Sequence, residues 1–112
     1  MSGVSSRRKG SQFERDMVQK FREVMSDAGI RRGLQYRSGE EVADVDMPCF
    51  WPELKHQRRV NIREAMRQAI ETCPQGRWPI SICKDNHKPP LVTMQLDDFL
   101  DLLREWWEAR RQ

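Results

Sequence analysis

The sequence predicts one α/β domain with a mixed central β-sheet flanked by helices, in the element order α-β-β-β-α-β-β-α. Three observations lead to this prediction. Apolar residues recur at helical spacing in three separate segments. The segments between them contain short apolar runs bounded by Gly, Pro, Asn or Asp, which is typical of strands. The chain has 112 residues, too few for a second hydrophobic core.

The first half of the chain is expected to hold one helix and three strands. Residues 1–6 are small and polar and are expected to form a flexible tail. From Ser11 to Ala28 the apolar side chains recur at helical intervals, and Gly29 favours a helix end there. The other expected elements are strands at residues 34–37, 42–47 and 50–56 and a turn at residues 38–41.

The second half is expected to hold a helix between strands and a final helix. Apolar residues form a stripe at helical spacing from Ile62 to Cys73. Asn61 is a favourable N-cap for this helix, and Pro74 favours its end. The other expected elements are strands at residues 80–84 and 91–96 and a helix that begins near residue 97.

The segment Glu53-Leu54-Lys55 is the most informative part of the chain for function. In an extended strand Glu53 and Lys55 project from one face and Leu54 from the other. Asp44 or Asp46, in the preceding expected strand, would bring a second carboxylate to the same place. Converging carboxylates raise each other's pKa unless a cation compensates, and Mg²⁺ prefers oxygen ligands. With a lysine beside them, these groups indicate metal-assisted phosphodiester hydrolysis.

Basic residues gather in two segments around this acidic motif, although the net charge is only +3. Local basic clusters beside a metal site suit a polyanionic substrate, which must be held while a cation acts on one phosphate. Solvated helix faces are the alternative interpretation. The candidate DNA-binding residues of these segments are Arg7, Arg8, Lys9, Arg58, Arg59, Arg63 and Arg67.

The cysteines and the hydropathy of the chain bear on its location. Cys49, Cys73 and Cys83 form no Cys-x-x-Cys motif, and their odd number indicates free thiols in a reducing compartment. His56 and His87 have no partner at metal-ligand spacing, which argues against zinc. No apolar stretch approaches the length of a membrane span, and the start of the chain is polar. We therefore expect a cytoplasmic protein with no membrane partner.

Three motifs in the first half of the chain form a recognisable pattern. Arg8–Arg15 reads as a basic-Gly turn entering a helix that carries a glutamate, and residues 37–39 read Arg-Ser-Gly. Asp44, Glu53 and Lys55 follow as an Asp…Glu-x-Lys set. Together they resemble the PD-(D/E)XK nuclease superfamily, and more narrowly the archaeal-type Holliday junction resolvases and their phage relatives. The rest of the chain resembles this restriction-endonuclease-like nuclease core by element order only.

The resemblance implies a metal centre and a catalytic lysine. Glu14, Asp44 and Glu53 would bind one or two Mg²⁺ ions, and Mn²⁺ would substitute. The carbonyl of Leu54 would be a further ligand. Lys55 would orient the attacking water or stabilise charge on the phosphate. Asp44 is preferred to Asp46 because it stands at the family-like position, and Asp46 is kept as an alternate or supporting ligand.

The resemblance also implies how DNA is held. Ser38 would lie in a loop that closes toward the cut strand, and Arg8, Lys9 and Arg37 would contact the DNA backbone. The expected substrate is a four-way DNA junction and the expected state is a homodimer, because two symmetric strands must be cut. Pro52, directly before Glu53, departs from the simplest pattern and is interpreted as a local bulge.

Other functions remain open at this stage. A nuclease of the same fold could act in restriction, nicking or end-processing. A DNA-binding protein could keep the fold without catalysis, although the complete acidic set and Lys55 argue against it. A third alternative is an interaction subunit that docks a partner through the last helix, where Trp106 and Trp107 are expected to serve as core or dimer-interface residues.

Overall fold

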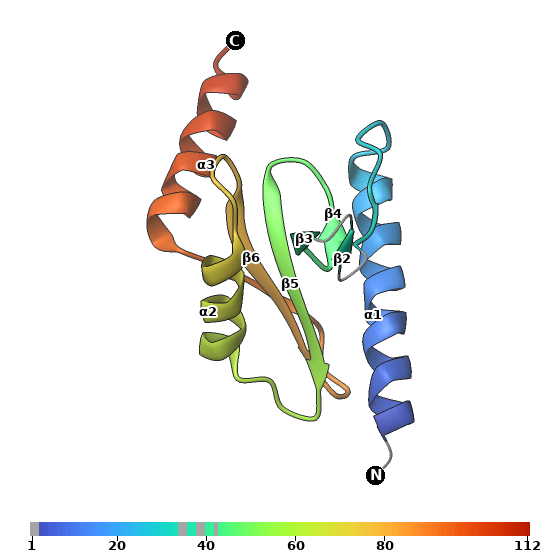
Figure 1. Ribbon diagram of the computed structural model, residues 1–112. Coiled ribbons are helices and arrows are strands. Elements are labelled where there is room, and N and C mark those ends of the chain that lie inside the picture. The colour runs from blue at the N-terminus through green and yellow to red at the C-terminus, as the bar shows by residue number, and fades with distance from the viewer. Residues whose placement is uncertain (1–2, 34–35, 38–39, 42) are drawn as a thin grey trace.

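The computed structural model describes residues 3–33, 36–37, 40–41 and 43–112, and side chains for 8–33 and 43–112. Three helices and seven strands lie in this part of the chain (Figure 1). In chain order they are α1 (Gly3–Val24), β1 (Arg31–Arg32), β2 (Tyr36–Arg37), β3 (Glu40–Glu41), β4 (Val45–Asp46), β5 (Phe50–Gln57), α2 (Ile62–Thr72), β6 (Trp78–Asp85), β7 (Leu91–Met94) and α3 (Leu96–Arg110).

The main sheet has the strand order β5-β6-β7 and is mixed. β5 and β6 run parallel with a continuous register that pairs Glu53 with Ser81, and β7 runs antiparallel to β6. Helix α2 makes the crossover between the two parallel strands, which need such a connection. An α/β domain with a mixed sheet and three helices is therefore confirmed, whereas the finer nuclease topology stays a prediction.

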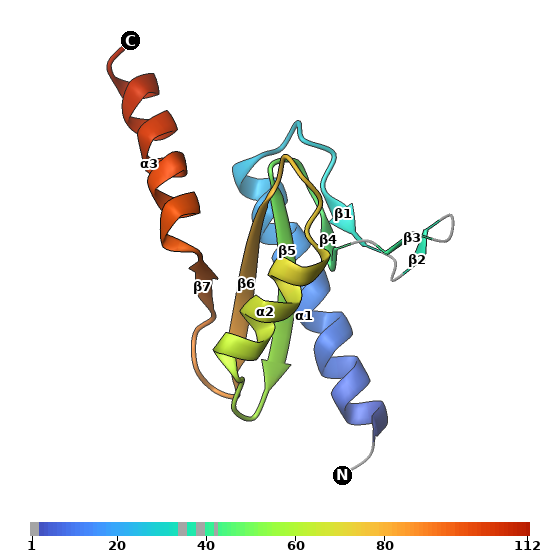
Figure 2. The same ribbon diagram turned by 60° about the vertical axis from the view of Figure 1, so that its left-hand side comes forward.

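The two faces of the sheet are covered by different helices, α1 on one side and α2 on the other (Figures 1 and 2). The core lies between α1 and the sheet, where Phe13, Met17 and Val18 pack with Leu54, Ile80 and Ile82. On the other face α2 buries Ala65, Met66 and Ala69. Because strand side chains alternate, Leu54 faces α1 and its neighbours Glu53 and Lys55 face the α2 side.

The central sheet is smaller than expected. The sequence predicted five strands in one sheet, but among the described residues β1 pairs only with β4 and β2 only with β3. Pro52 supplies one physical reason, because it has no amide hydrogen to donate toward β4. The Asp44 amide donates to the Pro52 carbonyl at 3.3 Å, and little further backbone pairing follows. The pairing of Pro52 with β6 shows no bulge, since its register there is unbroken, and a bulge on the side that faces β4 stays a prediction.

Several element boundaries also differ from those predicted. Helix α1 begins at Gly3, so it includes residues 3–6, which were expected to form a tail, and Gly10, which was expected in a turn. No proline precedes residue 48 to stop a helix, and one internal glycine costs only about 1 kcal/mol. Glu40–Glu41 forms β3 and not a turn. Residues 38–39, the other half of that turn, lie outside the described residues.

The second half matches the prediction closely. Helix α2 spans Ile62–Thr72 and its N-cap is confirmed, since the Asn61 side chain accepts a hydrogen bond from the Glu64 amide at 3.0 Å. β6 extends beyond the predicted strand at both ends, and α3 begins at Leu96. Helix α3 projects away from the sheet and buries none of its residues (Figure 2).

Candidate active site

The candidate site lies at the edge of β5 that faces β4. Here the carboxylate of Asp44 accepts a hydrogen bond from the backbone amide of Leu54, with an Oδ2–N distance of 2.8 Å. In a regular ladder a backbone carbonyl would occupy that position. The Asp44 side chain therefore substitutes for a missing strand partner, and the same hydrogen bond fixes its position beside Glu53.

Glu53 and Lys55 lie on one face of β5, as the sequence predicted. The Lys55 ammonium is 3.5 Å from Oε2 of Glu53, and both side chains are largely buried, with 29% and 21% of their surfaces exposed. Lys55 also acts electrostatically on Glu64, in the first turn of α2. Lys55 thus contacts Glu53 and lies within electrostatic reach of the start of that helix.

The Asp44 and Glu53 carboxyl groups are close enough to hydrogen bond to each other. Burial, and then the negative charge of Asp44, raise the pKa of Glu53 to about 7, against the opposing effect of Lys55. Burial likewise raises the pKa of Asp44; the Leu54 amide opposes this, and the charge of Glu14 adds to it. One lysine does not compensate these acids, so two buried carboxyl groups share a site with a deficit of positive charge.

Glu14 reaches the same site from α1. Its carboxylate is near enough to Asp44 to raise the pKa of that residue. Its Oε1 atom also accepts from both the Nη2 and Nε groups of Arg32 in β1, at 2.8 and 3.2 Å. The structure therefore brings Asp44 and Glu53 together and places Glu14 within electrostatic reach of Asp44, but Glu14 is already engaged by a cation of the chain.

The donor chemistry of this site fits Mg²⁺, which prefers carboxylate and carbonyl oxygens. Within the described ranges no three His, Cys, Asp or Glu side chains are arranged to hold a metal ion. The arrangement departs from a ready metal cage chiefly at Glu14, whose carboxylate faces Arg32. Binding through all three acids would therefore require Glu14 to exchange Arg32 for the cation, while Asp44 and Glu53 would give up their shared hydrogen bond.

Gly33 holds the Asp44 segment in place. The Gly33 amide donates to the Asp44 carbonyl at 2.9 Å. A Cβ atom on Gly33 would fall 1.7 Å from the Ala43 carbonyl oxygen, far inside any real contact. Only glycine allows this close backbone approach, so Gly33 positions the aspartate without touching its side chain.

The alternative ligand Asp46 lies elsewhere. Its Oδ2 atom forms an ion pair with Nε of Arg31 at 3.1 Å. Asp44, and not Asp46, is therefore the aspartate placed beside Glu53 and Leu54. His56 faces the opposite side of the sheet, as expected, with its ring in edge-to-face contact with Phe13 at 5.6 Å between centroids.

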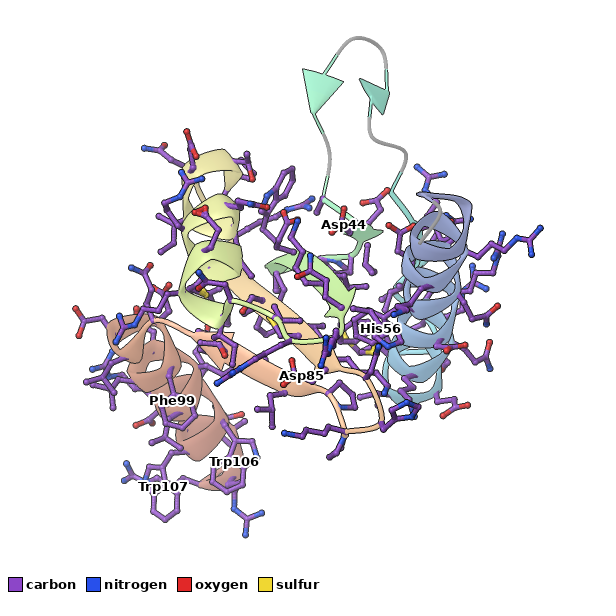
Figure 3. All side chains as sticks on the ribbon, turned by 90° about the horizontal axis from the view of Figure 1, so that it is seen from below. Asp44, His56, Asp85, Phe99, Trp106 and Trp107 are labelled. Atoms are coloured by element: carbon purple, nitrogen blue, oxygen red, sulfur yellow. The ribbon has the colours of Figure 1, made fainter. Side chains whose placement is uncertain are left out.

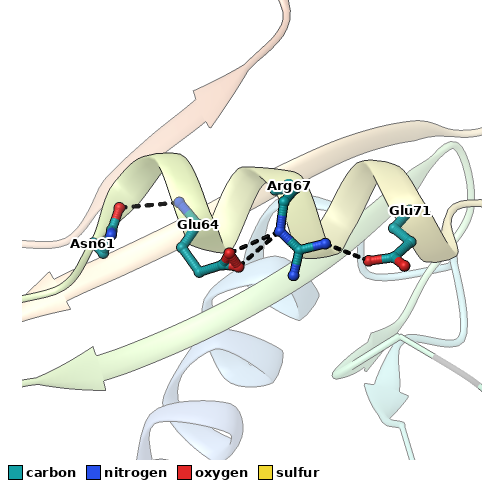
Figure 4. A network of polar contacts seen from close by, with 4 residues as sticks. All are labelled: Asn61, Glu64, Arg67 and Glu71. Carbon is teal, nitrogen blue, oxygen red and sulfur yellow. Dashed lines mark hydrogen bonds and ion pairs between the residues drawn. The ribbon is translucent and has the colours of Figure 1, made fainter.

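The expected DNA-binding residues have different environments. Arg8, Arg58, Arg59 and Arg63 are exposed. Arg67 is bound by two acids of its own helix, Glu64 at 2.7 Å and Glu71 at 2.6 Å (Figure 4). This pairing neutralises much of its charge and makes it the weakest candidate of the set. The Arg7 and Arg37 side chains and all of Ser38 lie outside the described residues.

Lys9 belongs to a basic cluster that sequence analysis did not find. Its ammonium donates to Oδ1 of Asn86, 77 residues away, at 2.9 Å. The pKa of His56 is lowered first by burial and then by the charges of Lys84 and Lys9. Lys9, His56 and Lys84 thus gather at the carboxyl end of β5. No sequence signal could link Lys9 with the β6–β7 turn.

Two further residues of the site were also missed. Arg32 lies in a short strand, β1, that the sequence did not predict, and Gly33 follows it directly. The Gly in Arg32-Gly33 was the available signal, because a glycine after a strand often marks a close backbone approach.

Comparison of the chain with protein-family models, with curated proteins and with solved structures finds no match in any of the three. In the described part of the chain, no helix is both long and apolar enough to cross a bilayer. Cys49, Cys73 and Cys83 are all free thiols. The function must therefore be argued from the site itself.

Proposed function

We propose that the protein is a Mg²⁺-dependent, structure-selective DNA endonuclease and, within that class, a homodimeric Holliday junction resolvase. The observation that carries the chemistry is the meeting of Asp44 and Glu53 beside Lys55, with Glu14 within electrostatic reach. Such a charge-deficient acidic site is suited to a hard divalent cation. The choice of a four-way junction rests on the sequence resemblance.

Each residue has a distinct task in this proposal. Asp44 and Glu53 would hold the metal, together with Glu14 and the Leu54 carbonyl. When bound, Mg²⁺ supplies positive charge at the scissile phosphate and lowers the pKa of a bound water. Lys55 donates hydrogen bonds to the attacking water or to a phosphate oxygen, where charge develops in the transition state. Its contact with Glu53 holds the ammonium group at the site.

The basic residues support binding to a DNA backbone. Lys9, His56 and Lys84 gather about three residues beyond Glu53 along β5, which is roughly 10 Å in an extended strand. They lie on the α1 face of the sheet, opposite the face that carries Glu53 and Lys55, so a DNA backbone that contacts both must cross the end of β5. Arg58 and Arg59 follow directly in the chain and are exposed. Contacts of this kind position a phosphate backbone and read no bases, as a structure-selective enzyme requires.

Incubation with labelled four-way junction, nicked duplex and linear duplex, each with Mg²⁺, with Mn²⁺ and with EDTA, tests the proposal. We expect paired, symmetric cuts in the junction with either metal and none with EDTA. Preferential cutting of nicked or linear duplex would identify the alternative, a related nicking or end-processing nuclease. Cleavage that persists in EDTA would exclude the metal-dependent mechanism.

A DNA-binding protein without catalysis is the second candidate, and the Arg32–Glu14 ion pair is the observation that favours it. If Arg32 holds Glu14 permanently, the third carboxylate never reaches a metal. Tight binding of the junction with no cleavage at any Mg²⁺ or Mn²⁺ concentration would support this candidate.

A further inference from the structure

The fold leaves an apolar surface of β7 and α3 uncovered. Helix α3 has 15 residues and buries none of them. The exposed residues are large and apolar. They are Leu91, Val92, Leu96, Phe99, Leu100, Leu103, Trp106 and Trp107, with exposed fractions between 43% and 68%. Monomeric proteins rarely expose a continuous apolar surface of this extent, and such a surface marks an interaction site.

The size of the molecule agrees with a missing partner. Its accessible surface is 8350 Å² at 13.3 kDa, whereas a folded monomer of that mass exposes about 6500 Å². Its radius of gyration is 14.7 Å, whereas a compact domain of this length has about 13 Å. The excess area is larger than the roughly 800 Å² that each partner buries in a stable interface.

The two ends of this surface have complementary shapes. At the start of α3 an open groove of about 350 Å³ is lined by Val92, Thr93, Met94, Leu96 and Phe99. Near the other end the Trp106 and Trp107 rings project side by side, 6.3 Å apart (Figure 3). The groove and the indoles are thus separated along the helix axis by roughly 10 to 16 Å, from the positions of Leu96 and Phe99 to those of Trp106 and Trp107.

The charges on α3 are also unequal between its ends. Its first half carries Asp97, Asp98 and Asp101 and no base. Its second half carries Arg104 and Arg110, followed by Arg111, against Glu105 and Glu108, so this end has a small net positive charge. Arg104 pairs with Asp101 and Arg111 with Glu108 within the chain, whereas Arg110 lies 4.7 Å above the ring of Trp106. Two such helices repel each other side by side in parallel and attract each other in antiparallel. The antiparallel arrangement also opposes the two helix dipoles favourably.

We propose that β7 and α3 form a two-fold interface with a second copy of this chain, in which the α3 helices pair antiparallel. Trp106 and Trp107 of each copy then fill the groove at the start of the other copy's α3. The same pairing places each acidic half against the partner's arginine end. An isologous contact of this kind closes on itself and leaves no apolar surface for further addition.

This inference builds on the homodimer of the proposed function but not on its chemistry. The candidate active site lies on the other side of the molecule, as the positions of Asp44 and Trp106 in Figure 3 show. Oligomeric state and cleavage can therefore succeed or fail separately. Dimerisation without cleavage would leave the inference standing and refute only the nuclease proposal.

Sedimentation velocity of the 112-residue chain at micromolar concentration tests the interface. We expect a species of twice 13.3 kDa. The double variant Trp106→Ala/Trp107→Ala should raise the dimer dissociation constant by at least about 100-fold, since buried aromatic anchors dominate interfaces. The matched control is Val24→Ser on α1, a residue that is 81% exposed; it should leave the dimer unchanged. Circular dichroism checks that each variant is folded.

Cysteine cross-linking on a Cys49→Ser background tests the orientation and does not depend on the tryptophan variants. Leu103 is the midpoint of α3, and Leu96 is its first residue. In an antiparallel pair Leu103→Cys forms a disulfide-linked dimer on mild oxidation, and Leu96→Cys does not. Linkage of both variants would mean a parallel pair and would overturn the proposed geometry. A wild-type chain that stays monomeric, or a dimer that the tryptophan changes do not weaken, would overturn the interface itself.

Discussion

The β4–β5 edge buries groups that can carry a charge, whereas the β7–α3 surface exposes large apolar side chains; folded proteins usually do the reverse in both cases. At the first, Asp44 and Glu53 are largely removed from water although each can carry a charge. At the second, two tryptophans remain about half exposed although both are apolar. Folding alone favours neither arrangement. Each region is therefore incomplete by itself, the first for lack of positive charge and the second for lack of apolar cover.

The two regions lack different kinds of partner. Buried carboxyl groups with raised pKa values are relieved by a cation, so the first region is suited to binding an ion. Exposed aromatic residues are relieved by dispersion contacts and the loss of apolar surface, so the second region is suited to binding protein. Four predictions test the first region, in decreasing order of expected effect.

Replacing Glu53 removes one of the two buried carboxyl groups that lack a compensating positive charge. Glu53→Gln should lower cleavage of a four-way junction by at least about a thousandfold, because a metal ligand and the Lys55 contact are lost together. Binding of the junction should stay near that of the wild type, since the fold and the basic residues are kept. Gel-shift and single-turnover assays measure the two effects. Glu71→Gln, on the outer face of α2, is the matched control; equal cleavage by Glu53→Gln would remove Glu53 from the mechanism.

The pH dependence of stability, measured without metal, tests whether the buried carboxyl groups lack a compensating positive charge. In the folded protein the pKa of Glu53 is raised from 4.5 to about 7. The contribution of Glu53 to the free energy of unfolding is therefore fully present below pH 4.5 and is lost as the pH rises through 7. The loss in free energy of unfolding can reach about 3 kcal/mol. Urea unfolding in EDTA should therefore show the wild type losing stability toward pH 8 relative to Glu53→Gln. Parallel pH profiles of the two proteins would contradict this expectation.

Gly33 tests how the aspartate is positioned. Gly33→Ala forces a Cβ atom against the Ala43 carbonyl, and such overpacking typically costs about 2 kcal/mol. We expect lower stability and, because the Asp44 backbone must shift, weaker Mg²⁺ binding. The matched control is Gly10→Ala inside α1, where nothing lies within 4 Å of the added atom; it should stabilise by up to about 1 kcal/mol. A well-tolerated Gly33→Ala would show that the backbone can move freely here.

Glu14 is expected to give the smallest effect. Its carboxylate must leave Arg32 before it can bind the metal, which offsets much of what a third ligand contributes, so Glu14→Gln should weaken Mg²⁺ binding by only about tenfold. Arg32→Gln should act in the opposite direction, because it frees the carboxylate. Calorimetric titration of both variants checks the pair. If Glu14→Gln and Arg32→Gln both bind Mg²⁺ with the affinity of the wild type, Glu14 lies outside the metal site.

The fold was predictable where hydrophobic periodicity was long and unbroken. The Ile62–Cys73 stripe gave α2 to within one residue at its end, with its N-cap. Between Arg31 and Asp46 the prediction was only partly confirmed. The strands predicted at residues 34–37 and 42–47 contain β2 and β4, which have two residues each, and the two-residue strands β1 and β3 were missed. Such short strands show no alternation, and their pairing depends on distant backbone groups, such as the Gly33 amide and the Asp44 carbonyl.

The site was predictable to the extent that it lies within one strand. The pairing of Glu53 with Lys55 follows from the period of two along β5, and the structure confirms it. The choice of Asp44 over Asp46 needed the resemblance, because both project to the same side of an extended strand. Arg32 and the Lys9–Asn86 contact could not be predicted, since each joins segments whose approach is set by tertiary packing.

Direct titration of the chain with Mg²⁺ at neutral pH, followed by calorimetry in buffers of different ionisation enthalpy, tests the central claim. If buried acids lacking a counter-charge form this site, the wild type binds Mg²⁺ and releases protons as the carboxyl groups ionise, and Asp44→Asn loses most of both signals. Absence of binding at millimolar Mg²⁺, or the same affinity and proton release in Asp44→Asn, would contradict the account.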